Sequence, residues 1–286
     1  MEALTYCIFC GSITKNEPKE HIVPEGLIGE SFFEVKYHSI VAPCRKLMLK
    51  NDEVCRRCNS TLSTLDSYLI GQCGFLRTLW NRTGTKSGRS ATSSRPGMHA
   101  RRGPNGPELF LNTSRRSATM SDGLKIMPTG PQELAVRVEK FAILGRTARV
   151  EFQHPMRLNK KLMRALHKIA FELLCLEKGS AVALGSAFDP LRSYVLQGKG
   201  SRTVILTTSA PVGSWELPFF GLDHRPDWPG WVATVRLLMT FYVDLSPGND
   251  FYRDVDFVQL HQDGMILWSD RGGGAFSLSG DEARRS

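Results

Sequence analysis

Long apolar segments are missing from this chain of 286 residues. It has no run of about 18 apolar residues, the length that suggests a transmembrane helix. Its first residues also lack the basic and then apolar regions of a secretory signal peptide, and no internal repeat is present. These absences predict a cytoplasmic protein without a membrane partner. The apolar fraction of 41% still suffices for a hydrophobic core, so the chain is not mainly disordered.

Cysteine is scarce, and its placement is uneven. The chain has 7 cysteines, an odd number that argues against a disulfide framework. Four of them form two Cys-x-x-Cys pairs, and two such pairs can direct four thiolates at one ion. The 44 residues between the pairs exceed the usual spacing of a zinc ribbon, so a segment is inserted between the two knuckles, and its Cys44 is an alternative ligand. The predicted ligands of a structural Zn²⁺ are Cys7, Cys10, Cys55 and Cys58.

Acidic residues are scarce in the middle of the chain. Residues 71–130 carry 10 Lys+Arg against 2 Asp+Glu, a net charge of +8, whereas residues 1–70 carry 8 against 9 and residues 131–286 carry 19 against 17. Clustered positive charge indicates a polyanion partner. Because residues 81–106 are rich in Ser, Gly, Pro and Arg, the segment is either a solvated linker or a segment that follows the phosphates of a nucleic acid, and we favour the second. The candidate nucleic-acid-binding residues are Arg77, Arg82, Lys86, Arg89, Arg101, Arg102, Arg115 and Arg116.

Apolar periodicity in the first part of the chain predicts one helix. Leucines recur at helical spacing from Asn59 to Ile70, which indicates an amphipathic helix. Two short apolar stretches before it, residues 39–42 and 46–49, are predicted to pair as strands. The order of the first module is then knuckle, strand pair, knuckle and helix.

The last part of the chain mixes helical and strand patterns. A helix is predicted from Asn159 to Glu177 and is ended by Gly179. Alternating or β-branched runs predict strands at residues 134–138, 148–152, 203–208, 232–243, 255–260 and 265–268. We therefore expect an α+β fold class with three parts: a zinc-knuckle module at 1–75, a basic linker at 76–130 and an α+β domain at 131–286.

A Glu-His pair lies between the two knuckles and has the chemistry of a phosphodiester hydrolase. His21 can take a proton from water near neutral pH, and Glu20 can hold a divalent cation that stabilises the developing negative charge. Asn59 and Asp66 are further oxygen donors, about two helical turns apart and therefore on the same helix face. Two structural interpretations compete with these roles: His21 is a buried histidine with its hydrogen bonds satisfied, and Asn59 is a helix cap.

These motifs together resemble a known family. The chain is similar to the HNH endonucleases, in particular to members with two zinc knuckles. The similarity rests on four motifs in this order: Cys-x-x-Cys, Lys19-Glu20-His21-Ile22-Val23-Pro24, Cys-x-x-Cys-Asn and a helix with Leu65-Asp66. The similarity covers residues 7–70 and implies the ββα-metal fold. It also implies that Glu20 is a ligand of the catalytic cation, that His21 is the general base and that Asn59 is a second ligand. Asn59 stands where the family has its last histidine, and Asp66 is a candidate additional ligand.

The resemblance implies a function as well. We expect a metal-dependent endonuclease that cuts double-stranded DNA with Mg²⁺ or another divalent cation, in restriction or antiviral defence. A double-strand break from one active site per chain needs either a homodimer or two sequential nicks. The alternative is a non-catalytic zinc-knuckle protein that binds nucleic acid.

Overall fold

The structure is a computed structural model. It describes residues 4–28, 34–37, 40–43, 47–73, 124–130, 133–138, 141–143, 146–148, 152–207, 219–223, 231–237, 240–248 and 265–270.

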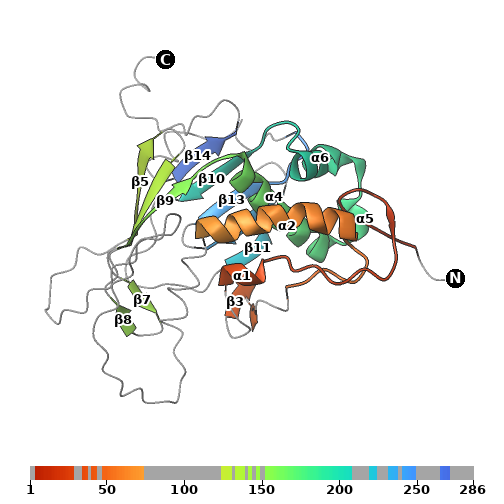
Figure 1. The fold of residues 1–286 in the computed structure, drawn as a ribbon, viewed down its shortest axis with the longest axis horizontal. Helices are drawn as coiled ribbons and strands as arrows, with labels where there is room; N and C mark the ends of the chain where they lie inside the picture. The colour runs from red at the N-terminus through yellow and green to blue at the C-terminus, as the bar shows by residue number, and fades with distance from the viewer. Residues whose placement is uncertain are drawn as a thin grey trace, which may run out of the picture.

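A seven-stranded sheet forms the centre of the fold (Figure 1). Its strand order is β14–β10–β13–β12–β11–β3–β4, and every neighbouring pair is antiparallel except β11 and β3, which are parallel. The strands are β3 (Glu34–Tyr37), β4 (Ile40–Pro43), β10 (Thr203–Thr207), β11 (Phe219–Asp223), β12 (Val232–Arg236), β13 (Thr240–Asp244) and β14 (Met265–Ser269). The hairpin of β3 and β4 thus extends a sheet whose other strands come from the C-terminal part of the chain.

Helix α4 (Lys160–Lys178) lies between the sheet and helix α2 (Arg56–Cys73) (Figure 1). It contacts β11, β12 and β13 as well as α2, and most of its side chains are buried. Asn159 caps its N-terminus by accepting a hydrogen bond of 3.0 Å from the Leu162 N–H, and Gly179, with φ of 87°, ends it. Both helices predicted from apolar periodicity are therefore confirmed.

The N-terminal segment is built from short elements. β1 (Thr5–Tyr6) and β2 (Ile13–Thr14) form a small hairpin, and α1 is a single turn (Glu25–Ile28). Residues 20–22 pair in antiparallel fashion with residues 47–49, since Ile22 N–H donates to Leu47 O and Leu49 N–H donates to Glu20 O. The predicted pairing of 39–42 with 46–49 is therefore wrong: β4 pairs with β3 instead.

The remaining described elements are two small sheets and three short helices. A three-stranded sheet has the order β5–β6–β9, and β7 pairs with β8. Their bounds are β5 (Leu124–Gly130), β6 (Glu133–Val138), β7 (Phe141–Ile143), β8 (Arg146–Ala148) and β9 (Phe152–Arg157), and three short helices follow α4, namely α5 (Ser180–Ala183), η2 (Ser186–Phe188) and α6 (Asp189–Gln197).

Three of the six runs predicted as strands in the last part of the chain agree with these bounds. The runs at 134–138, 203–208 and 265–268 are strands. The run at 232–243 splits into β12 and β13. Of the run at 148–152, Ala148 ends β8 and Phe152 begins β9, and residues 149–151 lie outside the described residues. The run at 255–260 lies outside the described residues. Sequence periodicity missed the helices between 180 and 197.

The zinc-knuckle segment and the C-terminal segment, predicted as separate domains, share one hydrophobic cluster in the described residues. The rings of Phe9 and Phe171 lie 5.4 Å apart between centroids. The Tyr68 hydroxyl accepts a hydrogen bond from the Asn159 amide, and the Gln72 side chain accepts one of 3.1 Å from a backbone N–H of β9. None of the helices in the described part of the chain combines the length and the apolar content that crossing a bilayer requires.

Candidate zinc centre and acidic cluster

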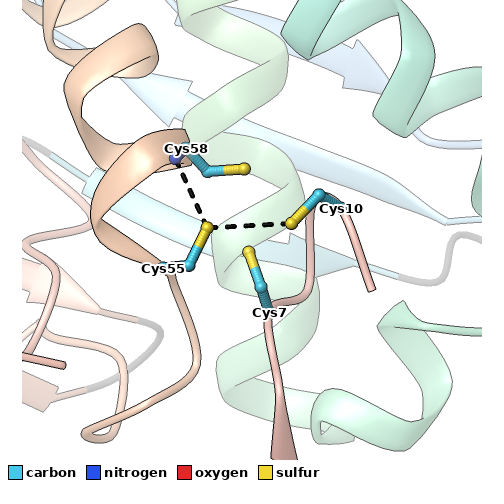
Figure 2. A group of neighbouring side chains, drawn as sticks. All are labelled: Cys7, Cys10, Cys55 and Cys58. Carbon is cyan, nitrogen blue, oxygen red and sulfur yellow. Dashed lines mark hydrogen bonds between the residues drawn. The ribbon is translucent and has the colours of Figure 1, made fainter. Parts of the chain in front are cut away.

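The four predicted zinc ligands converge at one point (Figure 2). All four Sγ atoms lie within 4.8 Å of one another, and the Sγ atoms of Cys10 and Cys55 are 3.7 Å apart. Tetrahedral Zn–S bonds of about 2.3 Å place ligand sulfurs about 3.8 Å from each other. The arrangement therefore fits one structural Zn²⁺, with Cys7 and Cys58 buried and Cys10 exposed.

Local backbone geometry builds both knuckles. In the first, the Gly11 N–H donates to Cys7 O over 2.8 Å, and Gly11 adopts a φ of 73° that a residue with a Cβ rarely takes. In the second, the Cys58 N–H donates to Cys55 Sγ over 3.4 Å in the first turn of α2. A hydrogen bond of 2.9 Å from Ile8 N–H to Glu53 O ties the two knuckles together.

The thiols influence each other because they are close. A hydrogen bond from Cys58 lowers the pKa of Cys7 to about 4, and the same contact raises the pKa of Cys58. The lowered pKa of Cys7 favours its thiolate, which is the form that binds metal.

The Glu-His pair lies on the strand segment that faces residues 47–49. His21 is partly exposed and forms an antiparallel bridge with Met48, while Glu20 is only 6% exposed. Since neighbouring side chains on a strand point to opposite faces, Glu20 turns into the protein interior and His21 turns the other way.

A buried lysine from α4 meets the predicted cation ligands. The Nζ atom of Lys168 lies 3.2 Å from Glu20 Oε1 and 3.0 and 2.9 Å from the two Asp66 oxygens. A third carboxylate, Glu172 on the same helix, has its Oε1 at 3.5 Å from the same nitrogen. Glu20 and Asp66, which the sequence analysis assigns to a divalent cation, thus both contact the Lys168 ammonium.

The carboxylates of this acidic cluster (Lys168, Glu20, Asp66 and Glu172) stabilise the charge of the lysine. Burial lowers the pKa of Lys168, but the attraction of the three carboxylates outweighs it and raises the pKa above its ordinary value. Burial raises the pKa of Asp66, and the Lys168 ammonium opposes that rise. Glu172 is fully buried, which raises its pKa well above the usual range and favours its neutral form.

Asn59 is not a helix cap, because α2 begins three residues before it at Arg56. It is partly exposed in the second turn of the helix, where its N–H donates to Cys55 O over 2.9 Å. Asp66 follows about two turns later on the same helix. The predicted order of the two residues along α2 is therefore confirmed.

Several predicted residues lie outside the described residues. They are the alternative zinc ligand Cys44 and the candidate nucleic-acid-binding residues Arg77, Arg82, Lys86, Arg89, Arg101, Arg102, Arg115 and Arg116.

Sequence reasoning missed Lys168 and Glu172. A signal for them exists: a lysine and a glutamate four residues apart, where they can pair on one helix face, interrupt an otherwise apolar stretch of the longest predicted helix. Charged residues in a helix that is buried on most sides need partners. The sequence does not say which partners those are.

Comparison of the chain with models of known protein families, with curated proteins and with solved structures found no match.

Proposed function

We propose that this protein is an endonuclease of the HNH type that hydrolyses phosphodiester bonds in DNA. One observation carries the proposal: two antiparallel segments, 20–22 and 47–49, precede α2, and the cysteine cluster lies where the two knuckles meet. Strand, strand and helix beside a zinc centre is the order that the resemblance to the family implies. His21 lies on the first segment, and the resemblance to the family makes it the candidate general base.

The residues of this segment suit proton transfer. His21 is partly exposed, so part of the residue is open to solvent. Histidine is the side chain that accepts a proton most readily near neutral pH. Bound at the four cysteines, Zn²⁺ would hold the two knuckles, and with them the 20–22 segment and the start of α2, in a fixed relation.

The predicted catalytic cation does not fit between Glu20 and Asp66. Both carboxylates already contact the Lys168 ammonium at 2.9 to 3.2 Å, so a divalent ion between them would lie next to a buried positive charge. Within the described ranges, the four cysteines are the only group of His, Cys, Asp or Glu side chains placed to share a metal ion. We therefore assign no step of the reaction to a divalent cation at Glu20, Asn59 and Asp66.

A cleavage assay tests the proposal. Zinc-loaded protein is incubated with supercoiled plasmid alone and with Mg²⁺, Mn²⁺ or Ni²⁺, beside His21→Ala and a control variant, Lys19→Ala, at an exposed neighbouring position. We expect nicking or linearisation by the wild type and by Lys19→Ala, and at least a 100-fold slower reaction with His21→Ala, the effect typical of losing a general base. A gel-shift assay should show equal DNA affinity for all three proteins. Cleavage by His21→Ala at the wild-type rate would remove His21 from the mechanism.

A second function, a zinc-knuckle protein that binds nucleic acid without cutting it, is favoured by the Lys168 contacts. They occupy the two acids that a metal-dependent nuclease would use. Retardation of the plasmid by wild type and His21→Ala, with no cleavage under any metal condition and none of single-stranded DNA or RNA, would select this function.

A further inference from the structure

Helix α4 inserts one lysine between two acids that belong to different parts of the zinc-knuckle segment. We propose that Lys168 is the resident cation of the Glu20–Asp66 pair: its ammonium excludes divalent ions from these acids and fixes the Glu-His segment and α2 to α4. Lys168 is a positioning residue, because it is fully buried and out of reach of a substrate.

The hydrogen-bonding capacity of the ammonium matches its surroundings. A lysine ammonium has three N–H donors, and three carboxylates lie around Nζ: Asp66 at 2.9 Å, Glu20 at 3.2 Å and Glu172 at 3.5 Å. The hydrogen bonds go to Glu20 Oε1 and to both Asp66 oxygens, and Glu172 adds an ion pair without a hydrogen bond. This arrangement explains how a charged lysine is accommodated with 0% exposure of its side chain.

The same geometry disfavours a divalent ion. Such an ion needs carboxylate oxygens at about 2.0 to 2.6 Å, so Glu20 and Asp66 would have to turn their oxygens away from Lys168. The lysine would then remain buried with only Glu172 beside it. An ammonium buried without its counter-charges is strongly unfavourable. Glu20 and Asp66 therefore stay paired with Lys168 and do not bind a divalent ion.

Lys168 also determines where the Glu-His segment lies. The Glu20 side chain is held by Lys168, and its backbone carbonyl accepts a hydrogen bond of 2.9 Å from Leu49 N–H. With the residue fixed at both ends, the backbone of the adjacent His21 has little freedom. Asp66 anchors α2 to the same nitrogen, so one buried contact joins three segments: the Glu-His strand, α2 and α4.

Only the link to His21 rests on the proposed nuclease function, and the exclusion of divalent ions does not. The test is therefore a binding measurement rather than an activity assay. Zinc-loaded wild type, Glu20→Gln and Asp66→Asn are titrated with Mn²⁺, and free Mn²⁺ is measured by electron paramagnetic resonance. We expect the three proteins to bind Mn²⁺ equally, with no site that depends on either acid. The proposal is overturned if the wild type binds one Mn²⁺ per chain and either variant binds it with an affinity at least tenfold lower.

A fourth protein tests the role of the ammonium directly. Lys168→Met keeps the length and apolar stem of the side chain and removes the charge, and circular dichroism checks that it folds. A folded Lys168→Met should gain Mn²⁺ affinity of at least tenfold over wild type, and this gain should disappear when Glu20→Gln is added. A folded variant without that gain would show that the ammonium is not what excludes the ion. If the variant does not fold, the comparison of wild type with Glu20→Gln and Asp66→Asn decides alone.

Plasmid cleavage by the same preparations separates this proposal from the proposed function. Absence of cleavage by the wild type counts against the nuclease and leaves the Mn²⁺ result unaffected. If the wild type cuts the plasmid and also has a Mn²⁺ site that depends on Glu20 or Asp66, the proposal of Lys168 as the resident cation is wrong. The proposed nuclease function is then retained.

Discussion

Replacing Lys168 by methionine should destabilise the protein substantially. The wild-type ammonium is fully buried, and its partners are nearly so: the side chains of Glu20, Asp66 and Glu172 are 8%, 17% and 0% exposed. Removing one member of a buried ion pair typically costs about 3–5 kcal/mol, because the other member stays buried without a counter-charge. Two features reduce this cost here. Asp66 is exposed enough to be partly hydrated, and burial already favours the neutral form of Glu172.

We therefore expect Lys168→Met to lower the free energy of unfolding by about 3 kcal/mol, at the low end of that range. The assay is urea denaturation at pH 7 followed by circular dichroism, with equal m-values as the check that the denatured states are alike. The matched control is Lys161→Met, the same substitution at an exposed position of α4, where the ammonium lies 5.8 Å from the centroid of the Tyr68 ring. Because an exposed cation–π contact is worth about 0.5–1 kcal/mol, this substitution should lower the free energy by no more than about 1 kcal/mol. Adding Glu20→Gln and Asp66→Asn to Lys168→Met should restore part of the loss, because the uncompensated charges are then gone.

The stabilisation by Lys168 has a defined pH dependence. Its pKa is raised in the folded protein, so its contribution is complete below the ordinary lysine pKa of about 10.5 and is lost as the pH rises through the folded value. Lys168→Met should therefore differ most from wild type near neutral pH and less above pH ~11. A loss below about 1 kcal/mol at pH 7, or one equal to that of Lys161→Met, would refute the reasoning.

Three further substitutions test other parts of the structure. Cys10→Ser should abolish the retention of one Zn²⁺ per chain and lower the melting temperature, measured by metal analysis after dialysis and by calorimetry, because a structural zinc adds its binding energy to folding. Gly11→Ala should cost about 1 kcal/mol in urea denaturation, since alanine is strained at a φ of 73°. His167 is fully buried, which lowers its pKa to about 3, with a smaller effect in the same direction from Arg202 and an opposing one from Asp270. An unfolded histidine titrates at about 6.5, so the neutral folded form loses about 2 kcal/mol of stability between pH 7 and pH 5. His167→Gln should remove that part of the pH dependence, and an unchanged slope would contradict the buried neutral histidine.

The sequence by itself determined the features that depend on local pattern. Two Cys-x-x-Cys pairs sufficed to predict the four-cysteine cluster, because each knuckle is a tight turn that positions two thiolates without help from the rest of the chain. The bounds of α4 followed from Asn159 and Gly179, because both act locally. The Asn159 side chain caps the first turn, and the Gly179 backbone ends the last one. The family resemblance gave Asp66 only as a candidate ligand of a divalent cation beside Glu20.

Only the tertiary structure decided which positive charge these acids meet. Lys168 reaches them because α4 packs against α2, and the contact of Phe9 with Phe171 also joins the first knuckle to α4. The hairpin β3–β4 joins the seven-stranded sheet through the pairing of β3 with β11, which is distant in sequence. Local sequence does not predict this pairing, because any neighbouring strand offers the same backbone hydrogen bonds. Periodicity shows which side chains seek burial, but it does not show what they will be buried against. For this reason a lysine that looked like one more basic residue proved to lie at the centre of the site.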